Sequence, residues 1–181
     1  MNSCFHSLLR TLIAFLAITV PLASALAANG PTGRQSDTGQ KPNIFHGAWF
    51  DVRYPADFTA RPSLKSSTAD GYDSAEFISP DGAVSFYVFA PQWGGNASDI
   101  ALIPEREQLV TEQRRKVRDR KIYWFTIAAR DGSYRRSYRE TVARQGSTKT
   151  IVGIKYRNEE ARLRYQNAYE LFRKSLKLYA D

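Results

Sequence analysis

Cysteine and histidine are almost absent from this sequence. The chain of 181 residues contains one cysteine, Cys4, and two histidines, His6 and His46. A zinc site needs several Cys or His ligands at short spacing, and a disulfide within the chain needs two cysteines. The sequence therefore predicts no zinc site and no disulfide, and a domain of this size can bury enough surface to fold without one.

Local motifs for nucleotide binding and serine catalysis are missing as well. The chain has no P-loop, no G-x-G-x-x-G turn and no G-x-S-x-G elbow. A Ser-His-Asp arrangement would have to use His46, at the edge of a polar tail, where we expect a surface histidine instead. We predict no catalytic residue and no cofactor.

The first 27 residues resemble a secretory signal peptide. Arg10 is their only charged residue, an apolar run extends from Leu12 to Val20, and the segment ends in Ala25-Leu26-Ala27. This run is shorter than the roughly 20 residues that cross a bilayer. We expect cleavage after Ala27 and a periplasmic protein that does not span the membrane; the alternative is an uncleaved anchor.

Cleavage would remove Cys4 and His6 and leave a formal charge of +7. Residues 28–43 contain no large apolar side chain, so we predict a flexible tail. Residues 44–181 then form a single domain.

Most of this domain alternates between apolar and polar residues, which is typical of strands. Two of the strands should form a hairpin around Ser79-Pro80-Asp81-Gly82, and later ones should be joined by turns at Asp131-Gly132 and Gln145-Gly146. The predicted strands are 49–54, 74–79, 84–89, 122–129, 134–142 and 148–156.

Two helices are expected between and after these strands. Pro104 suits a first helical position, and the acids and bases that follow match the dipole of a helix over 104–118. The second helix is amphipathic and covers 158–179, with Asn158 as its N-cap. The expected fold is α+β, an antiparallel sheet with helices on both faces.

Three segments resemble the PsbP-like fold family. They are Trp49–Phe58, with its Tyr-Pro-x-x-Phe turn, the hairpin from Phe77 to Phe89, and the helix end Phe172–Leu176. The family includes lumenal PsbP subunits, Ran-binding nucleotide-release factors and bacterial periplasmic DcrB-like proteins. The resemblance implies an α/β/α sandwich and a non-enzymatic accessory or binding protein, and it transfers no functional residue.

Positive charge is the most informative local feature. If two basic clusters meet in space, they form a surface that attracts anions. An isolated aromatic residue in a Gly-rich loop, Trp93, could anchor a partner or cover the core. The predicted contact residues are Arg114, Arg115, Arg118, Arg120 and Lys121, then Arg130, Arg135, Arg136 and Arg139, with Trp93.

We therefore expect recognition of an anionic envelope component or an acidic protein. Nucleic acid is not an expected partner, because an exported chain does not encounter it. The dipole of the first helix alone could also explain the first cluster. Two alternative functions stay open. The chain could be a structural subunit that docks onto an assembly by a sheet edge or by its last helix, or an envelope hydrolase whose catalytic carboxylates converge from distant positions. Asp70, Asp73 and Glu76 have two interpretations: an oxygen-ligand site for calcium or magnesium, or a solvated loop that leads into a strand. Oligomeric state stays open.

Overall fold

The computed structural model describes residues 41–92, 95–143 and 148–179. The signal peptide, nearly all of the tail, Trp93 and the Gln145-Gly146 turn lie outside the described residues, so what was predicted for them stays a prediction. Within the described ranges, no helix combines the length and hydropathy needed to cross a membrane.

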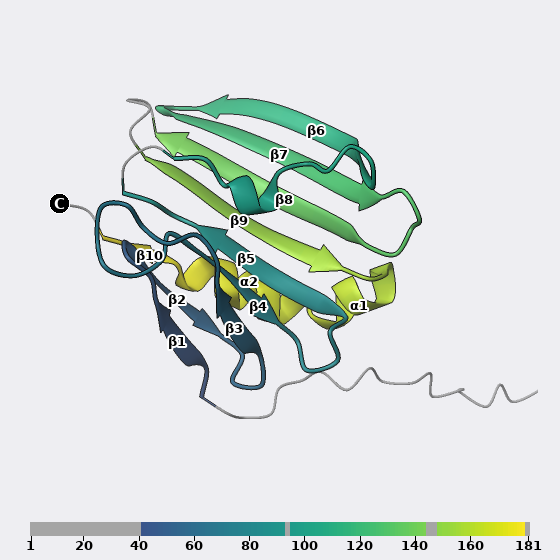
Figure 1. Ribbon diagram of the computed structural model, residues 1–181, viewed down its shortest axis with the longest axis horizontal. Helices are drawn as coiled ribbons and strands as arrows, with labels where there is room; N and C mark the ends of the chain where they lie inside the picture. Colours follow the sequence, from purple (N-terminus) through teal and green to yellow (C-terminus); the bar gives the residue numbers. More distant parts are fainter. Residues whose placement is uncertain (1–40, 93–94, 144–147, 180–181) are drawn as a thin grey trace, which may run out of the picture. The chain divides into compact units, whose positions relative to one another are not determined.

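The fold is built on a seven-stranded antiparallel sheet in the order β3-β4-β5-β9-β8-β7-β6 (Figure 1). A smaller antiparallel sheet has the order β1-β2-β10. The strands of the large sheet are β3 (Thr59–Pro62), β4 (Ser74–Ile78), β5 (Val84–Phe89), β6 (Glu107–Val117), β7 (Arg120–Ala129), β8 (Arg135–Ala143) and β9 (Lys149–Tyr156). The small sheet consists of β1 (Asn43–His46), β2 (Phe50–Tyr54) and β10 (Lys177–Leu178).

The two faces of the large sheet carry separate apolar cores. On the face that we call the helix face, Phe86 packs against Phe172 with ring centroids 5.2 Å apart. On the opposite face, which we call the loop face, Tyr87 meets Tyr138 edge to face at 5.8 Å. Neighbouring residues of β5 thus serve opposite cores, which explains why every residue of this strand is buried.

The predicted strands and turns are largely confirmed. The Ser79–Gly82 turn closes with a hydrogen bond from the Gly82 amide to the Ser79 carbonyl, 2.9 Å long. Gly82 has φ +60° and Gly132 has φ +74°, a region that glycine enters without steric penalty. The six predicted strands correspond to β2, β4, β5, β7, β8 and β9, while β1 and β3 were not predicted.

The predicted helix over 104–118 is wrong. Glu107–Val117 is the edge strand β6, which pairs with β7 along its length. All of its residues after Glu107 are exposed, so neither face had to be apolar and no period of two was visible in the sequence. Arg118, with φ +53°, forms the turn into β7.

The predicted single helix over 158–179 begins as expected but is divided. The Asn158 side chain accepts a hydrogen bond from the Ala161 amide at 2.8 Å, so Asn158 is the N-cap. Helix α1 (Glu159–Arg164) is separated from α2 (Gln166–Ser175) by Tyr165. After α2 the chain becomes extended and β10 pairs with β2, because that pairing gives the last backbone groups a partner.

Helices on both faces are not confirmed. Ala161 of α1 and Phe172 of α2 are buried in the core of the helix face. The described segment 95–103, with a short 3-10 helix η1 (Ser98–Ile100), lies over the loop face instead (Figure 1).

Candidate functional site

Strand alternation divides the predicted arginines between the two faces of the sheet. The register from β6 to β9 places Arg115, Arg120, Arg135 and Arg139 on the helix face. The same register places Arg114, Lys121 and Arg136 on the loop face. Arg118 and Arg130 lie in turns. The predicted basic residues are thus divided between the two faces of the sheet.

Arg136 is a buried structural residue. Its five N–H groups donate to both carboxylate oxygens of Glu107, to the carbonyls of Ile100 and Ala101, and to the Tyr138 hydroxyl. No donor remains for an external anion. Arg136 therefore fastens the segment before β6 onto the sheet, a role that local sequence reasoning did not predict.

Glu107 is the buried partner of Arg136. Burial by itself would raise the pKa of Glu107, but hydrogen bonds from Arg136, Tyr134 and the Ile103 amide outweigh it and hold the pKa at about 2. The carboxylate stays charged at neutral pH and neutralises Arg136.

Arg114 and Arg130 make weaker local contacts. Arg114 lies over the Tyr123 ring, 4.7 Å from its centroid, and its Nη2 atom is 3.7 Å from Glu112. Arg130 donates from Nε to the Pro104 carbonyl at 3.1 Å. Their remaining donors face solvent, as these side chains lie at exposed positions.

On the helix face, one residue from each predicted basic cluster lines the same hollow. Arg120 of β7 and Arg139 of β8 line a single hollow of about 360 Å³, together with Arg173 of α2. We call it the arginine hollow. Its other lining residues are Thr141, Ala143, Thr148, Thr150, Val152, Leu176 and Leu178.

The arginine hollow holds more positive charge than its surroundings neutralise. Arg173 pairs with Glu170 at 2.6 Å, but neither Arg120 nor Arg139 is paired with a carboxylate among the described residues. Within the same part of the chain, the Nε atoms of Arg139 and Arg173 are buried without a hydrogen-bond partner. Such buried, unsatisfied donors are rare in native proteins. Arg173 was not predicted, because its closeness to Arg139 comes only from the packing of α2.

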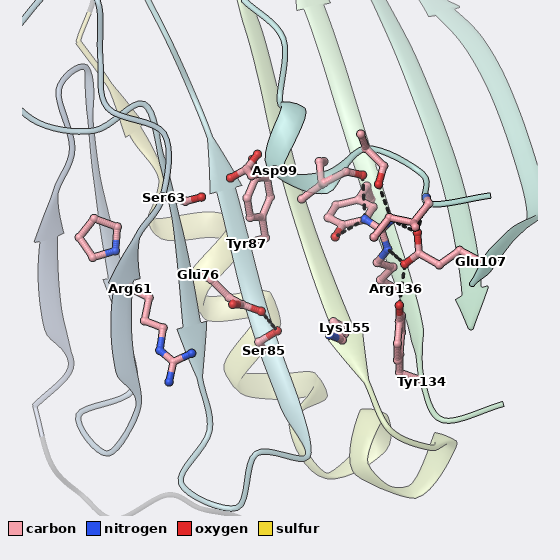
Figure 2. Close-up of a pocket in the computed structure, with 15 residues that line it drawn as sticks. Arg61, Ser63, Glu76, Ser85, Tyr87, Asp99, Glu107, Tyr134, Arg136 and Lys155 are labelled. Carbon is pink, nitrogen blue, oxygen red and sulfur yellow. Dashed lines mark hydrogen bonds and ion pairs between the residues drawn. The ribbon is translucent and has the colours of Figure 1, made fainter. Parts of the chain in front are cut away.

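A second hollow crosses the loop face, as Figure 2 shows. We call it the loop-face groove; it has about 380 Å³ and continues into a neighbouring hollow of about 330 Å³. Glu76 and Ser85 lie at its centre, with Arg61 on one side and Lys155 and Tyr134 on the other (Figure 2).

The carboxylates of the loop-face groove are engaged within the fold. Asp99 accepts hydrogen bonds from Tyr87 at 2.7 Å and from Ser74 at 2.8 Å, one on each oxygen. Glu76 accepts a hydrogen bond from Ser85 at 2.6 Å. Together with Glu107, these acids stabilise the groove's walls, and Lys155 rests on the Tyr134 ring at 4.3 Å. This groove thus has mixed charge, unlike the arginine hollow.

The remaining sequence candidates are dispersed. In the described ranges, no group of three His, Cys, Asp or Glu side chains is placed to hold a metal ion, so Asp70, Asp73 and Glu76 do not form one. His46 lies on β1, where its Nδ1 atom is 2.6 Å from Asp51 on a solvent-exposed surface.

Comparisons with known proteins identify structural neighbours only. No family model and no curated protein sequence matches the chain. A cyanobacterial PsbP from Synechocystis shares 12% identity with a TM-score of 0.45, over 83% of this chain and 100% of that chain. A Bacteroides thetaiotaomicron protein shares 16% identity with a TM-score of 0.44, over 78% of this chain and 50% of its own.

The Ran-binding protein Mog1p from Saccharomyces cerevisiae shares 9% identity with a TM-score of 0.37, over 76% of this chain and 96% of its own. The neighbours thus include a PsbP and a Ran-binding protein, two of the three kinds of protein named by the sequence resemblance. No residue role or partner is taken from them.

Proposed function

We propose that this protein is an exported, periplasmic accessory protein that binds an anionic partner through a basic outer sheet. The basic outer sheet consists of β6, β7, β8 and the turns between them, residues 107–143. Its partner is an anionic component of the cell envelope or an acidic protein.

The observation that carries this proposal is an excess of positive charge on one part of the sheet. Residues 107–143 contain ten Lys or Arg and five Asp or Glu, out of a net charge of +8 for the whole chain. One of these acids, Glu107, is already used by buried Arg136. Most of the chain's net charge is therefore concentrated in three neighbouring strands, which raises the local concentration of anions.

The basic residues of the β6–β7 hairpin are available to a partner. Residues 108–121 are all exposed. Within the described chain, the one ion pair that involves this stretch joins Arg114 to Glu112. Because β6 is a strand, the helix dipole cannot explain why so many bases gather here.

A charge-reversal pair tests the proposal. The variant Arg115→Glu, Arg118→Glu should bind immobilised polyglutamate and phosphatidylglycerol vesicles about tenfold more weakly or worse than the parent. Binding by the parent should also fall steeply from about 50 mM to about 500 mM salt, because screening shortens the reach of surface charges. Sedimentation with vesicles and retention on the polyanion measure both effects.

The matched control is Arg61→Glu, Lys65→Glu, which changes net charge by the same amount near the opposite edge of the sheet. It should keep most of the binding. Salt-independent binding, or equal weakening by both variants, would show that the basic outer sheet is not the contact surface.

A further inference from the structure

The arginine hollow brings together cations from three separate elements. Arg120 begins β7, Arg139 lies in the middle of β8, and Arg173 is near the end of α2. Guanidinium groups are planar forks that bind carboxylate and phosphate oxygens in pairs. Three of them lining one hollow favour the binding of an anion there.

Charge balance narrows the class of anion. The three arginines carry three positive charges, and Glu170, bound to Arg173, offsets one of them. Among the described residues that line the hollow there is no carboxylate. A phosphate monoester carries about −1.5 to −2 charges near pH 7, which matches the remaining excess.

We infer that the arginine hollow binds the phosphate group of a phosphate monoester. This inference rests on the proposed function and names the chemical class that one part of the basic outer sheet recognises, with α2 supplying the third arginine.

Unsatisfied donors support this assignment. The Nε atoms of Arg139 and Arg173 are buried and have no partner in the described structure. A buried donor without a partner destabilises a protein, so a bound oxygen that accepts a hydrogen bond from it is favourable. Arg139 also lies over the Trp124 ring, 5.9 Å from its centroid, which restricts its orientation.

Tyr169 of α2, a partly buried phenol, is influenced by both cations. Burial raises the pKa of Tyr169, while Arg173 and Arg139 both act to lower it. Two guanidiniums from different elements thus act on one side chain of α2, which agrees with their place in one hollow.

The hollow's size and walls suit an ester rather than a bare ion. Its volume of about 360 Å³ exceeds what a phosphate group alone fills. Val152, Leu176 and Leu178 give it an apolar side, and three threonines add hydroxyl groups. The carbon part of the ester would lie against the apolar side while the phosphate faces the arginines.

Calorimetric titration of the mature chain tests the inference. The probes are inorganic phosphate and glucose 1-phosphate, with dimethyl phosphate as a diester of lower charge. Both dianions should bind and dimethyl phosphate should bind about tenfold more weakly or not at all. Arg139→Gln and Arg173→Gln should each weaken the binding of the dianions about tenfold or more, since each removes a charged hydrogen-bonding group.

The matched control is Arg61→Gln, an exposed arginine at the opposite edge of the sheet, outside both the hollow and the basic outer sheet. It loses the same charge and should keep nearly all phosphate binding. Arg139→Lys retains the charge but not the fork, so it should fall between the parent and Arg139→Gln. Unchanged melting temperatures would confirm that the variants are folded.

Vesicle binding distinguishes the sources of the phosphate. A soluble ligand predicts binding of glucose 1-phosphate with no preference for phosphatidic acid over phosphatidylglycerol vesicles. A lipid headgroup predicts a preference for phosphatidic acid, again lost in Arg139→Gln. Either result supports the inference. Absence of binding to every monoester, or equal binding by folded Arg139→Gln and Arg61→Gln, would overturn it.

The experiments distinguish failure of the proposed function from failure of the phosphate-binding inference. If polyglutamate binding depends on Arg115 and Arg118 while no phosphate monoester binds, only the arginine hollow is wrong. If phosphate binding depends on Arg139 while polyglutamate binding is insensitive to salt and to both charge reversals, only the wider surface is wrong.

Discussion

At the scale of single residues, Arg136 and Glu107 show how burial changes the role of a charged side chain. Arg136 lies among basic neighbours in the sequence, yet its side chain is only 7% exposed and its partner's only 2%. All of its donors are used inside the protein. The attraction within a buried ion pair does little more than offset the cost of removing both charges from water. Replacing one partner, however, leaves the other charge buried without compensation, which is strongly destabilising.

Glu107 predicts a specific pH dependence of stability. Its pKa falls from the ordinary 4.5 to about 2 in the folded protein. Its contribution to the free energy of unfolding is therefore complete above pH 4.5 and is lost as pH falls toward 2. The loss should be about 3 kcal/mol. Urea unfolding at a series of acidic pH values measures it.

Glu107→Gln should be destabilised by several kcal/mol at neutral pH, because Arg136 keeps its charge without a partner. Its stability should also vary less between pH 5 and pH 2 than that of the parent. Glu105→Gln, an exposed neighbour, serves as the control and should follow the parent. Parallel pH curves for Glu107→Gln and the parent would contradict the assigned role.

At the scale of elements, β6 shows where periodicity fails as a predictor. An edge strand with both faces exposed has no need for alternating apolar residues. Its exposed Leu109, Val110 and Val117 happen to have a helical spacing, but the neighbouring strand β7 supplies hydrogen bonds that override it. The irregular register near Val110 and the many charges also oppose edge-to-edge pairing with a second copy.

The start of α1 is an element whose sequence signal and structure agree. Asn158 caps the helix, and Glu159 and Glu160 occupy its first turn. We predict that Asn158→Ala lowers the free energy of unfolding by about 1 kcal/mol, because the Ala161 amide loses its partner.

Asn158→Asp retains an accepting oxygen and should be close to the parent in stability. Urea unfolding at neutral pH measures the three proteins together. Equal stability of Asn158→Ala and the parent would show that solvent replaces the cap without loss.

At the scale of the whole molecule, the sheet separates two kinds of surface. The loop face holds a mixed-charge groove whose acids are bound internally, and the helix face holds the arginine hollow. The small sheet and both helices pack at the β4, β5 and β9 part of the large sheet (Figure 1). The basic outer sheet extends beyond that layer.

The proposed export makes a prediction for the chain as a whole. Expressed with its leader in a bacterial host, the protein should be recovered from the periplasm with Ala28 as its first residue. Its intact mass then lacks residues 1–27, and a native mass spectrum would show any retained ligand. A mass that includes the leader would contradict cleavage after Ala27.

The sequence by itself determined the features that depend on neighbouring residues. Alternation identified the buried strands, Asp-Gly and Pro-Asp-Gly identified the hairpin turns, and Asn158 identified the start of the last helical region. Only the tertiary structure decided which basic residues share a surface. Adjacent strand residues face opposite sides, so Arg135 and Arg136 separate. Arg139 and Arg173, far apart in the sequence, line the same hollow because α2 packs on the sheet.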